Sequence, residues 1–237
     1  MKHLKLLTFL LLVILANSVK AQDDPWHRIG NYLSLDSMMK KGYTLIFINK
    51  DSTFATTGGQ VKQHMEDTFF EVYPKLAKTY NKNTLKKVIF IIDPNYNGVA
   101  ATSGSIIRYN PSWMLRKPTD IDVVTHEVMH IVQEYGYGAG PVWLTEGIAD
   151  YVRYKFGVDN EGAKWSLTPY REGQSYKNSY RITARFFVWA EKHGNANLVK
   201  QLDAQLRSHA YNEDSWKQLT GKTLDELWNT YIVDPKI

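Results

Sequence analysis

The N-terminal half of the chain alternates short apolar runs with one long amphipathic segment. Residues 43–49 and 87–92 are apolar runs bounded by turn residues, a pattern that predicts two strands. Residues 99–109 predict one or two further strands, interrupted at residues 103–104, where a Ser-Gly pair allows a turn. Residues 60–80 predict a helix, because apolar side chains recur there every three or four positions. Its apolar side consists of Val61, Met65, Phe69, Val72 and Leu76.

Helical patterns dominate the C-terminal half. Residues 182–193, 198–208, 213–219 and 224–233 each carry the apolar repeat of an amphipathic helix. Internal repeats and low-complexity tracts are absent from the sequence. We therefore expect an α+β fold, with a small mixed β-sheet in the N-terminal half and a mostly helical C-terminal half.

Two helices joined by a tight loop are expected in the middle of the chain. The first begins near Thr119, which can cap the free backbone amides, and it ends at Gly136. The second begins at Pro141, whose fixed backbone suits the first position of a helix. Because the glycine-rich segment between them is short, the two helices are expected to run back alongside each other.

The first of these helices carries His126, Glu127 and His130, spaced as His-Glu-x-x-His. Residues four apart lie above one another on a helix, so both imidazoles can bind one metal ion, with Glu127 beside it. The flanking residues are apolar almost all round, which indicates a buried helix. Two histidines and a glutamate in a buried helix need polar partners, and a metal ion satisfies all three. The pattern predicts one Zn²⁺ ion.

A catalytic zinc ion takes three protein ligands and keeps a position for water, so a third ligand is required. We choose Glu146, five residues after Pro141. His130 lies five residues before Tyr135, the expected last residue of the first helix, so the two side chains come level across the loop. Asp150, one turn beyond Glu146, is expected to bond the outer nitrogen of a ligating histidine. The alternatives are a surface carboxylate for Glu146 and a helix salt bridge for Asp150.

Three motifs in this order resemble the plant basic secretory protein family, which also has bacterial members. They are His-Glu-x-x-His-x-x-Gln at 126–133, Glu-Gly-Ile-Ala-Asp-Tyr-Val-Arg at 146–153 and Ser-Tyr-Arg-Ile-Thr-Ala-Arg-Phe at 179–186. The second motif also resembles the third-ligand helix of gluzincin metallopeptidases. The resemblance covers roughly residues 43–231 and implies a secreted, zincin-like zinc peptidase domain. Plant members often carry cysteines, whereas this chain has none, so disulfides are not carried over.

In such a peptidase, Glu127 would take a proton from the water that attacks the peptide carbonyl. The developing oxyanion needs a further hydrogen-bond donor. Because other gluzincins place a Tyr or His donor downstream of the third ligand, the resemblance favours Tyr180 as a second catalytic residue. Tyr170 and Tyr176 are substitutes for that role, and packing in the core is the alternative interpretation of Tyr180. Gln133 is expected to bond the backbone and not the metal.

The substrate is expected to be a peptide or protein. An unpaired edge strand can pair with an extended substrate backbone, and residues 101–109 are the candidate for that strand. An aminopeptidase also needs a carboxylate to bind the substrate's ammonium group. Residues 99–110 contain no Asp or Glu, which favours an endopeptidase, although another loop could supply the acid.

The first 21 residues have the pattern of a signal peptide: a basic start, an apolar core at residues 6–16 and a small residue at Ala21. We expect export to the periplasm or the medium and a single domain over residues 22–237. The first 21 residues hold three lysines and no acid, so their removal reduces the net charge from +5 to +2. Nucleic-acid binding and stable membrane insertion are not expected, and we expect a monomer.

Two other functional classes fit the sequence less well. A non-catalytic zinc-binding protein would need the three ligands but not Glu127. An exported carbohydrate-associated binding protein would need exposed aromatic side chains. The candidates for stacking on sugars are Trp26, Trp113, Trp165 and Trp216, and packing in the core or at its rim is an equally good interpretation of each.

Overall fold

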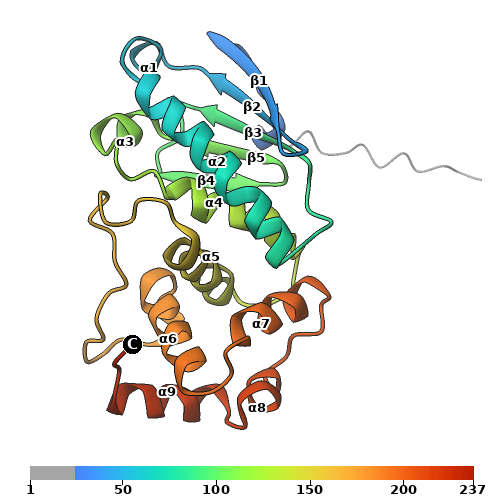
Figure 1. Ribbon diagram of the computed structural model, residues 1–237, viewed down its shortest axis with the longest axis vertical. Helices are drawn as coiled ribbons and strands as arrows, with labels where there is room; N and C mark the ends of the chain where they lie inside the picture. The colour runs from blue at the N-terminus through green and yellow to red at the C-terminus, as the bar shows by residue number, and fades with distance from the viewer. Residues whose placement is uncertain (1–24) are drawn as a thin grey trace, which may run out of the picture.

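The computed structural model describes residues 25–237. The expected signal peptide, residues 1–21, lies outside the described residues, so both it and the expected domain boundary stay predictions. A β-sheet with its covering helices forms one half of the molecule and a helical region forms the other (Figure 1). The expected α+β order is confirmed. Within residues 25–237, no helix combines the length and apolar character needed to cross a bilayer.

In the described part of the chain, the sheet has five strands in the order β1-β2-β3-β5-β4. The parallel pairs are β2 with β3 and β3 with β5, whereas β1 and β4 join the two edges in antiparallel fashion. The strands are β1 (Ser34–Lys40), β2 (Tyr43–Asn49), β3 (Lys87–Ile92), β4 (Ala100–Ser103) and β5 (Ile106–Tyr109). The predicted strands are confirmed, and the last predicted segment divides into β4 and β5. Strand β1 was not predicted, because most of its residues are exposed and its polar and apolar positions do not alternate.

One face of the sheet is covered by α2 (Gly59–Thr79), and the five predicted apolar positions of this helix are all buried. Below the sheet, α4 (Val123–Gln133), α5 (Val142–Phe156) and α6 (Tyr180–His193) pack successively against one another, as Figure 1 shows. The remaining helices are α1 (Ser52–Thr57), α3 (Pro111–Arg116), α7 (Leu198–Arg207), α8 (Ser215–Thr220) and α9 (Leu224–Val233), with short 3-10 turns η1 (Pro25–His27) and η2 (Tyr176–Asn178).

The histidine-bearing helix α4 spans Val123–Gln133 and begins later than the sequence suggested. Thr119 was predicted to cap it, but the N-cap residue is Asp122. The Asp122 carboxylate makes no capping bond to a backbone amide of α4. It accepts hydrogen bonds from the Thr125 hydroxyl of α4 and from the backbone N–H groups of residues 158 and 159. Asp122 therefore ties the start of α4 to a loop 36 residues further along the chain.

The other end of α4 also differs from the prediction, which placed the stop at Gly136. The helix ends earlier because Glu134 adopts a left-handed backbone with φ 46°. Its carboxylate accepts a hydrogen bond from Asn81 Nδ2 at 2.9 Å, which holds this unusual conformation in place. The next helix, α5, spans Val142–Phe156, and Pro141 is its N-cap residue, not its first helical residue.

Close approach of α6 to α5 depends on Gly147. A Cβ atom at this position would lie 2.4 Å from Thr183 Cγ2, which is far inside the normal contact distance. Glycine therefore lets the start of α6 lie against the middle of α5, and this brings Tyr180 next to the histidine helix.

Candidate metal centre

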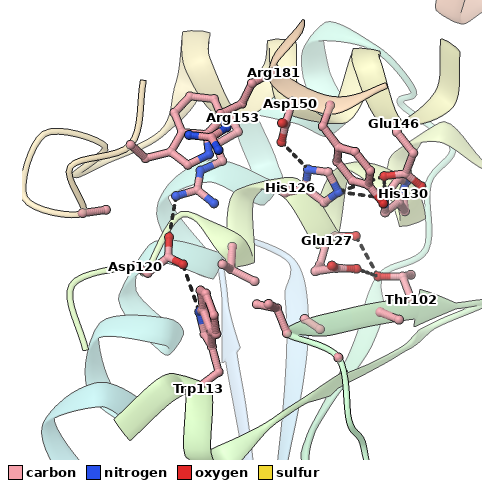
Figure 2. A pocket seen from close by; sticks show the side chains of 18 of the residues that line it. Thr102, Trp113, Asp120, His126, Glu127, His130, Glu146, Asp150, Arg153 and Arg181 are labelled. Atoms are coloured by element: carbon pink, nitrogen blue, oxygen red, sulfur yellow. Dashed lines mark hydrogen bonds and ion pairs between the residues drawn. The ribbon is translucent and has the colours of Figure 1, made fainter. Parts of the chain in front are cut away.

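The structure places the three predicted metal ligands together between α4 and α5. His126 Nε2 lies 3.2 Å from Glu146 Oε2, and His130 Nε2 lies 3.5 Å from the same oxygen. The two Nε2 atoms are 3.1 Å apart. One ligand atom from each residue therefore falls within a sphere small enough for a single ion, all lying within 4.8 Å of one another (Figure 2).

Each histidine is held from behind by a different partner. His126 Nδ1 lies 2.7 Å from Asp150 Oδ1, the contact that the sequence predicted for Asp150. His130 Nδ1 lies 2.7 Å from Gln133 Oε1. The Gln133 amide in turn donates to the Thr145 backbone carbonyl at 2.9 Å, so one side chain connects the histidine to the start of α5. The backbone bond of Gln133 agrees with the prediction, whereas its bond to His130 was not predicted, although the three-residue spacing on a helix indicates it.

These partners fix which ring nitrogens carry protons. A carboxylate only accepts, so His126 donates its Nδ1–H to Asp150. Because the Gln133 nitrogen already donates to a carbonyl, its oxygen accepts the Nδ1–H of His130. Both Nε2 atoms therefore point their lone pairs at each other and at the Glu146 carboxylate. Three acceptors converge, and only a positive charge satisfies them.

The pKa values of this group agree with that requirement. Burial alone would lower the pKa of His126, but the Asp150 and Glu146 carboxylates outweigh burial and raise it to about 10. Burial alone would raise the pKa of Glu146, but hydrogen bonds with both histidines hold it well below its ordinary value. A proton supplies the charge in the metal-free protein. Two imidazoles and one carboxylate are also the donor set of catalytic zinc sites that keep a coordination position open.

Glu127 lies beside this group, and its carboxylate is held by the sheet. Its Oε2 accepts a hydrogen bond from Thr102 Oγ1 at 2.7 Å. Thr102 belongs to β4, the edge strand, and its hydroxyl also lies 3.1 Å from the Glu127 backbone carbonyl. The sequence contains no signal for this contact, because the two residues belong to separate elements that only the fold brings together.

Tyr180 lies next to His126. Its ring stacks on that of His126, with centroids 6.0 Å apart and planes 19° from parallel. Burial and then the nearby Glu146 carboxylate raise the pKa of its hydroxyl. Tyr180 and Ser179 both have left-handed backbones, with φ 52° and 64°. Such conformations in consecutive non-glycine residues are costly and often accompany functional sites.

The two substitute tyrosines lie elsewhere in the fold. The Tyr176 hydroxyl donates to Asp225 Oδ1 at 2.7 Å, and Tyr170 packs its ring against Trp228. Among residues 25–237, neither belongs to the lining of the cleft that contains the metal group. Tyr180 does belong to that lining.

A cleft of about 1000 Å³ contains the metal group. Ala100, Ala101 and Thr102 of the edge strand β4 form part of its lining, so a strand edge that is unpaired within residues 25–237 lies beside the metal group. The prediction that residues 101–109 form that edge holds only for β4, because β5 is an interior strand paired on both sides.

Two of the four tryptophans proposed to stack on sugars, Trp113 and Trp165, line this cleft and are half-buried. Trp216 is fully buried in the core, which agrees with the packing interpretation and excludes stacking on a sugar at this residue. Trp26 is half-buried, and its ring lies against the Arg108 guanidinium.

Comparison with known sequences gives one family. The sequence profile described as BSP, peptidase of plants and bacteria, matches residues 49–231. A search among curated proteins found no match.

Two solved structures of M1 zinc metallopeptidases align with the chain. One is a mutant enzyme from Deinococcus radiodurans, with 12% identity and a TM-score of 0.38 over 85% of this chain and 48% of the enzyme. The other is a two-domain mutant enzyme bound to L-tryptophan, with 14% identity and a TM-score of 0.39 over 84% of this chain and 47% of the enzyme. The chain spans about half the length of these enzymes, and the likeness is too distant to transfer any residue or activity.

Proposed function

The chain belongs to the BSP family, the peptidases of plants and bacteria, and from this premise we propose that it is a zinc-dependent endopeptidase. One observation carries the proposal: the Nε2 atoms of His126 and His130 and the Glu146 carboxylate converge as three acceptors, with Glu127 fixed beside them in the same cleft. A non-catalytic zinc-binding protein would require the three ligands, but it would have no role for the buried Glu127 carboxylate, which Thr102 holds in the same cleft.

A zinc ion held by these three side chains would supply Lewis acidity, polarising the peptide carbonyl and lowering the pKa of water. Glu127 acts as the general base that accepts the proton of the attacking water, and it then delivers that proton to the leaving amine. Thr102 keeps the Glu127 carboxylate in position for both transfers. Tyr180 donates its hydroxyl hydrogen to the oxyanion that develops on the carbonyl oxygen.

The edge strand β4 suggests how a substrate binds. An extended peptide can pair with its free backbone groups and pass beside the metal group. Cleavage within a chain is favoured because the acids of the described cleft lining leave no free carboxylate for a terminal ammonium group. Glu127 and Glu146 belong to the metal group, Asp150 bonds His126, and Asp120 bonds Arg153.

The proposed activity is tested by incubating the zinc-loaded protein with a diverse peptide mixture and identifying new termini by mass spectrometry. The wild type should cleave internal bonds, whereas Glu127→Gln, with full zinc content and an unchanged melting temperature, should not. Equal cleavage by both proteins, or no cleavage by fully loaded wild type, would remove the peptidase mechanism. In the second case, the non-catalytic zinc-binding alternative would stand.

Export remains part of the proposal and rests on the sequence of residues 1–21. If the full gene is expressed in a bacterial host with an intact secretion system, N-terminal sequencing should find Gln22 first in protein from the periplasm or medium. Recovery of uncleaved protein from the cytoplasm alone would contradict export. Sedimentation of the same material tests the expected monomer.

A further inference from the structure

The cleft continues beyond the metal group to a region rich in positive charge. Figure 2 shows Arg153 and Arg181 on the side of His126 away from Glu146. Lys117 and Lys164 also belong to the lining. Two acids of the lining lie on this side, Asp120 and Asp150, and each is already bonded, Asp120 to Arg153 and Asp150 to His126, so four cations of the lining stand against two carboxylates.

Arg153 is the buried centre of this region, with 5% of its surface exposed. Its Nη2 donates to Asp120 Oδ1 at 2.6 Å, its Nε donates to Asn160 Oδ1 at 3.2 Å, and its guanidinium lies 4.5 Å from the centre of the Trp165 ring. Asp120 also accepts the indole N–H of Trp113 at 3.0 Å. The guanidinium is thus held in one orientation before any ligand arrives.

One part of this guanidinium is not used. Among residues 25–237, nothing accepts a hydrogen bond from Arg153 Nη1. The side chains of Lys117, Lys164 and Arg181 are exposed, so their charges reach the cleft through solvent. A structural ion pair would need only Asp120 and Arg153. The excess of cations around an available guanidinium N–H indicates a binding site for an anion.

We propose that this region is a subsite that binds a carboxylate of the peptide substrate. The proposal rests on the proposed peptidase function and names its substrate class. Arg153 lies seven residues after Glu146 on α5, about 10 Å along the helix axis. An extended peptide advances about 3.3 Å per residue, so the carboxylate would lie about three residues from the cleaved bond. It is either an Asp or Glu side chain or the C-terminal carboxylate of a short peptide.

Binding tests the subsite without requiring turnover. Fluorescent decapeptides of one alanine-rich sequence, carrying Glu, Gln or Lys at each position in turn, would be titrated against zinc-loaded Glu127→Gln protein. At the best position, the Glu peptide should bind about tenfold more tightly than the Gln peptide, as expected for one charge-assisted hydrogen bond. Because three of the cations are exposed, the preference should shrink when salt is raised from about 50 to about 500 mM.

Charge reversal identifies the residues responsible. In the same Glu127→Gln background, Lys164→Glu with Arg181→Glu should abolish the preference for Glu and make the Lys peptide the tighter ligand. The matched control is Lys192→Glu, an exposed lysine in the last turn of α6, which should leave the preference unchanged. Equal binding of Glu and Gln peptides at every position, or a preference that survives the double reversal, would overturn the subsite.

Blocking the C-terminus of the peptide distinguishes a side-chain carboxylate from the carboxylate of the chain end. If a side chain binds, amidation of the peptide C-terminus leaves the Glu preference intact. If the chain end binds, amidation weakens binding by a similar factor and Glu at internal positions gives no gain. Cleavage by the wild type is measured separately, so a carboxylate preference in binding without cleavage of any peptide would refute the peptidase function and leave the subsite standing.

Discussion

Gln133 connects His130 to α5, the helix that carries Glu146. Replacing Gln133 should therefore show how zinc affinity and folding stability depend on it separately. The side chain is almost fully buried, with 1% of the residue exposed. In Gln133→Leu, the His130 Nδ1–H and the Thr145 carbonyl both lose their partner. A buried polar group left without a partner costs about 1–3 kcal/mol, so unfolding should become easier by about 2–4 kcal/mol. The melting temperature should fall by about 5–15 °C in a protein of this size.

Zinc affinity should fall as well, by about 10–100-fold, because the orientation of His130 is no longer fixed. Gln133→Glu separates the two effects. Its carboxylate can still accept from His130 but cannot donate to the Thr145 carbonyl, so it should destabilise the fold while binding zinc at least as tightly as the wild type.

Competition with a chromophoric chelator gives the zinc dissociation constants, and thermal melts of the metal-free proteins give the stabilities. Gln218→Leu, at an exposed position on α8, serves as the control and should change neither quantity. The role given to the Gln133–His130 hydrogen bond would be refuted if Gln133→Leu bound zinc as tightly as the wild type. An equal loss of zinc affinity in the Leu and Glu variants would also refute it.

Three further outcomes are expected. Thr102→Val should lower kcat about tenfold, because the hydrogen bond to Glu127 is lost, while KM and zinc content stay unchanged. Thr102→Ser should restore most of the lost kcat. A changed zinc content in the samples used for steady-state kinetics would contradict this role. Asp150→Asn should weaken zinc binding about 10–100-fold in a chelator competition, and unchanged affinity would show that Asp150 does not orient His126. The raised pKa of His126, about 10 against an ordinary 6.5, means that its proton stabilises the metal-free protein fully below pH 6.5 and progressively less as pH rises toward 10. Zinc must displace that proton, and the water on the zinc ion can lose another, so binding at pH 8 should release between about one and about two protons to an indicator dye; no release would contradict the proton assignment.

The sequence predicted those features that depend on short-range periodicity. The strands at residues 43–49 and 87–92 and the helix at residues 224–233 agree with the structure at both ends, because apolar runs and turn residues mark them. The convergence of Glu146 with the histidines also followed from helix geometry, since two antiparallel helices on a short loop bring equidistant residues level.

The features that the sequence did not predict depend on contacts between distant segments. Thr102 reaches Glu127 only because the edge strand lies beside α4. The end of α4 is set by a left-handed glutamate held by Asn81, where the pattern pointed to a glycine. Asp120 comes just before α4, and an acidic residue is well suited to the first turn of a helix, yet its carboxylate bonds Arg153 on α5. Each of these side chains bonds a residue that is distant in the sequence, and local propensity does not reveal such a partner.

Restoring metal to the chelated protein tests whether one zinc ion at His126, His130 and Glu146 is required for peptide hydrolysis. Cleavage of a peptide identified in the mixture would be measured as zinc is added in known fractions of one equivalent. We expect a linear rise in the cleavage rate that ends at one zinc per chain, with no recovery in Glu146→Ala at the same zinc concentrations. Activity that persists in the chelated protein, or that rises equally in Glu146→Ala, would contradict this requirement.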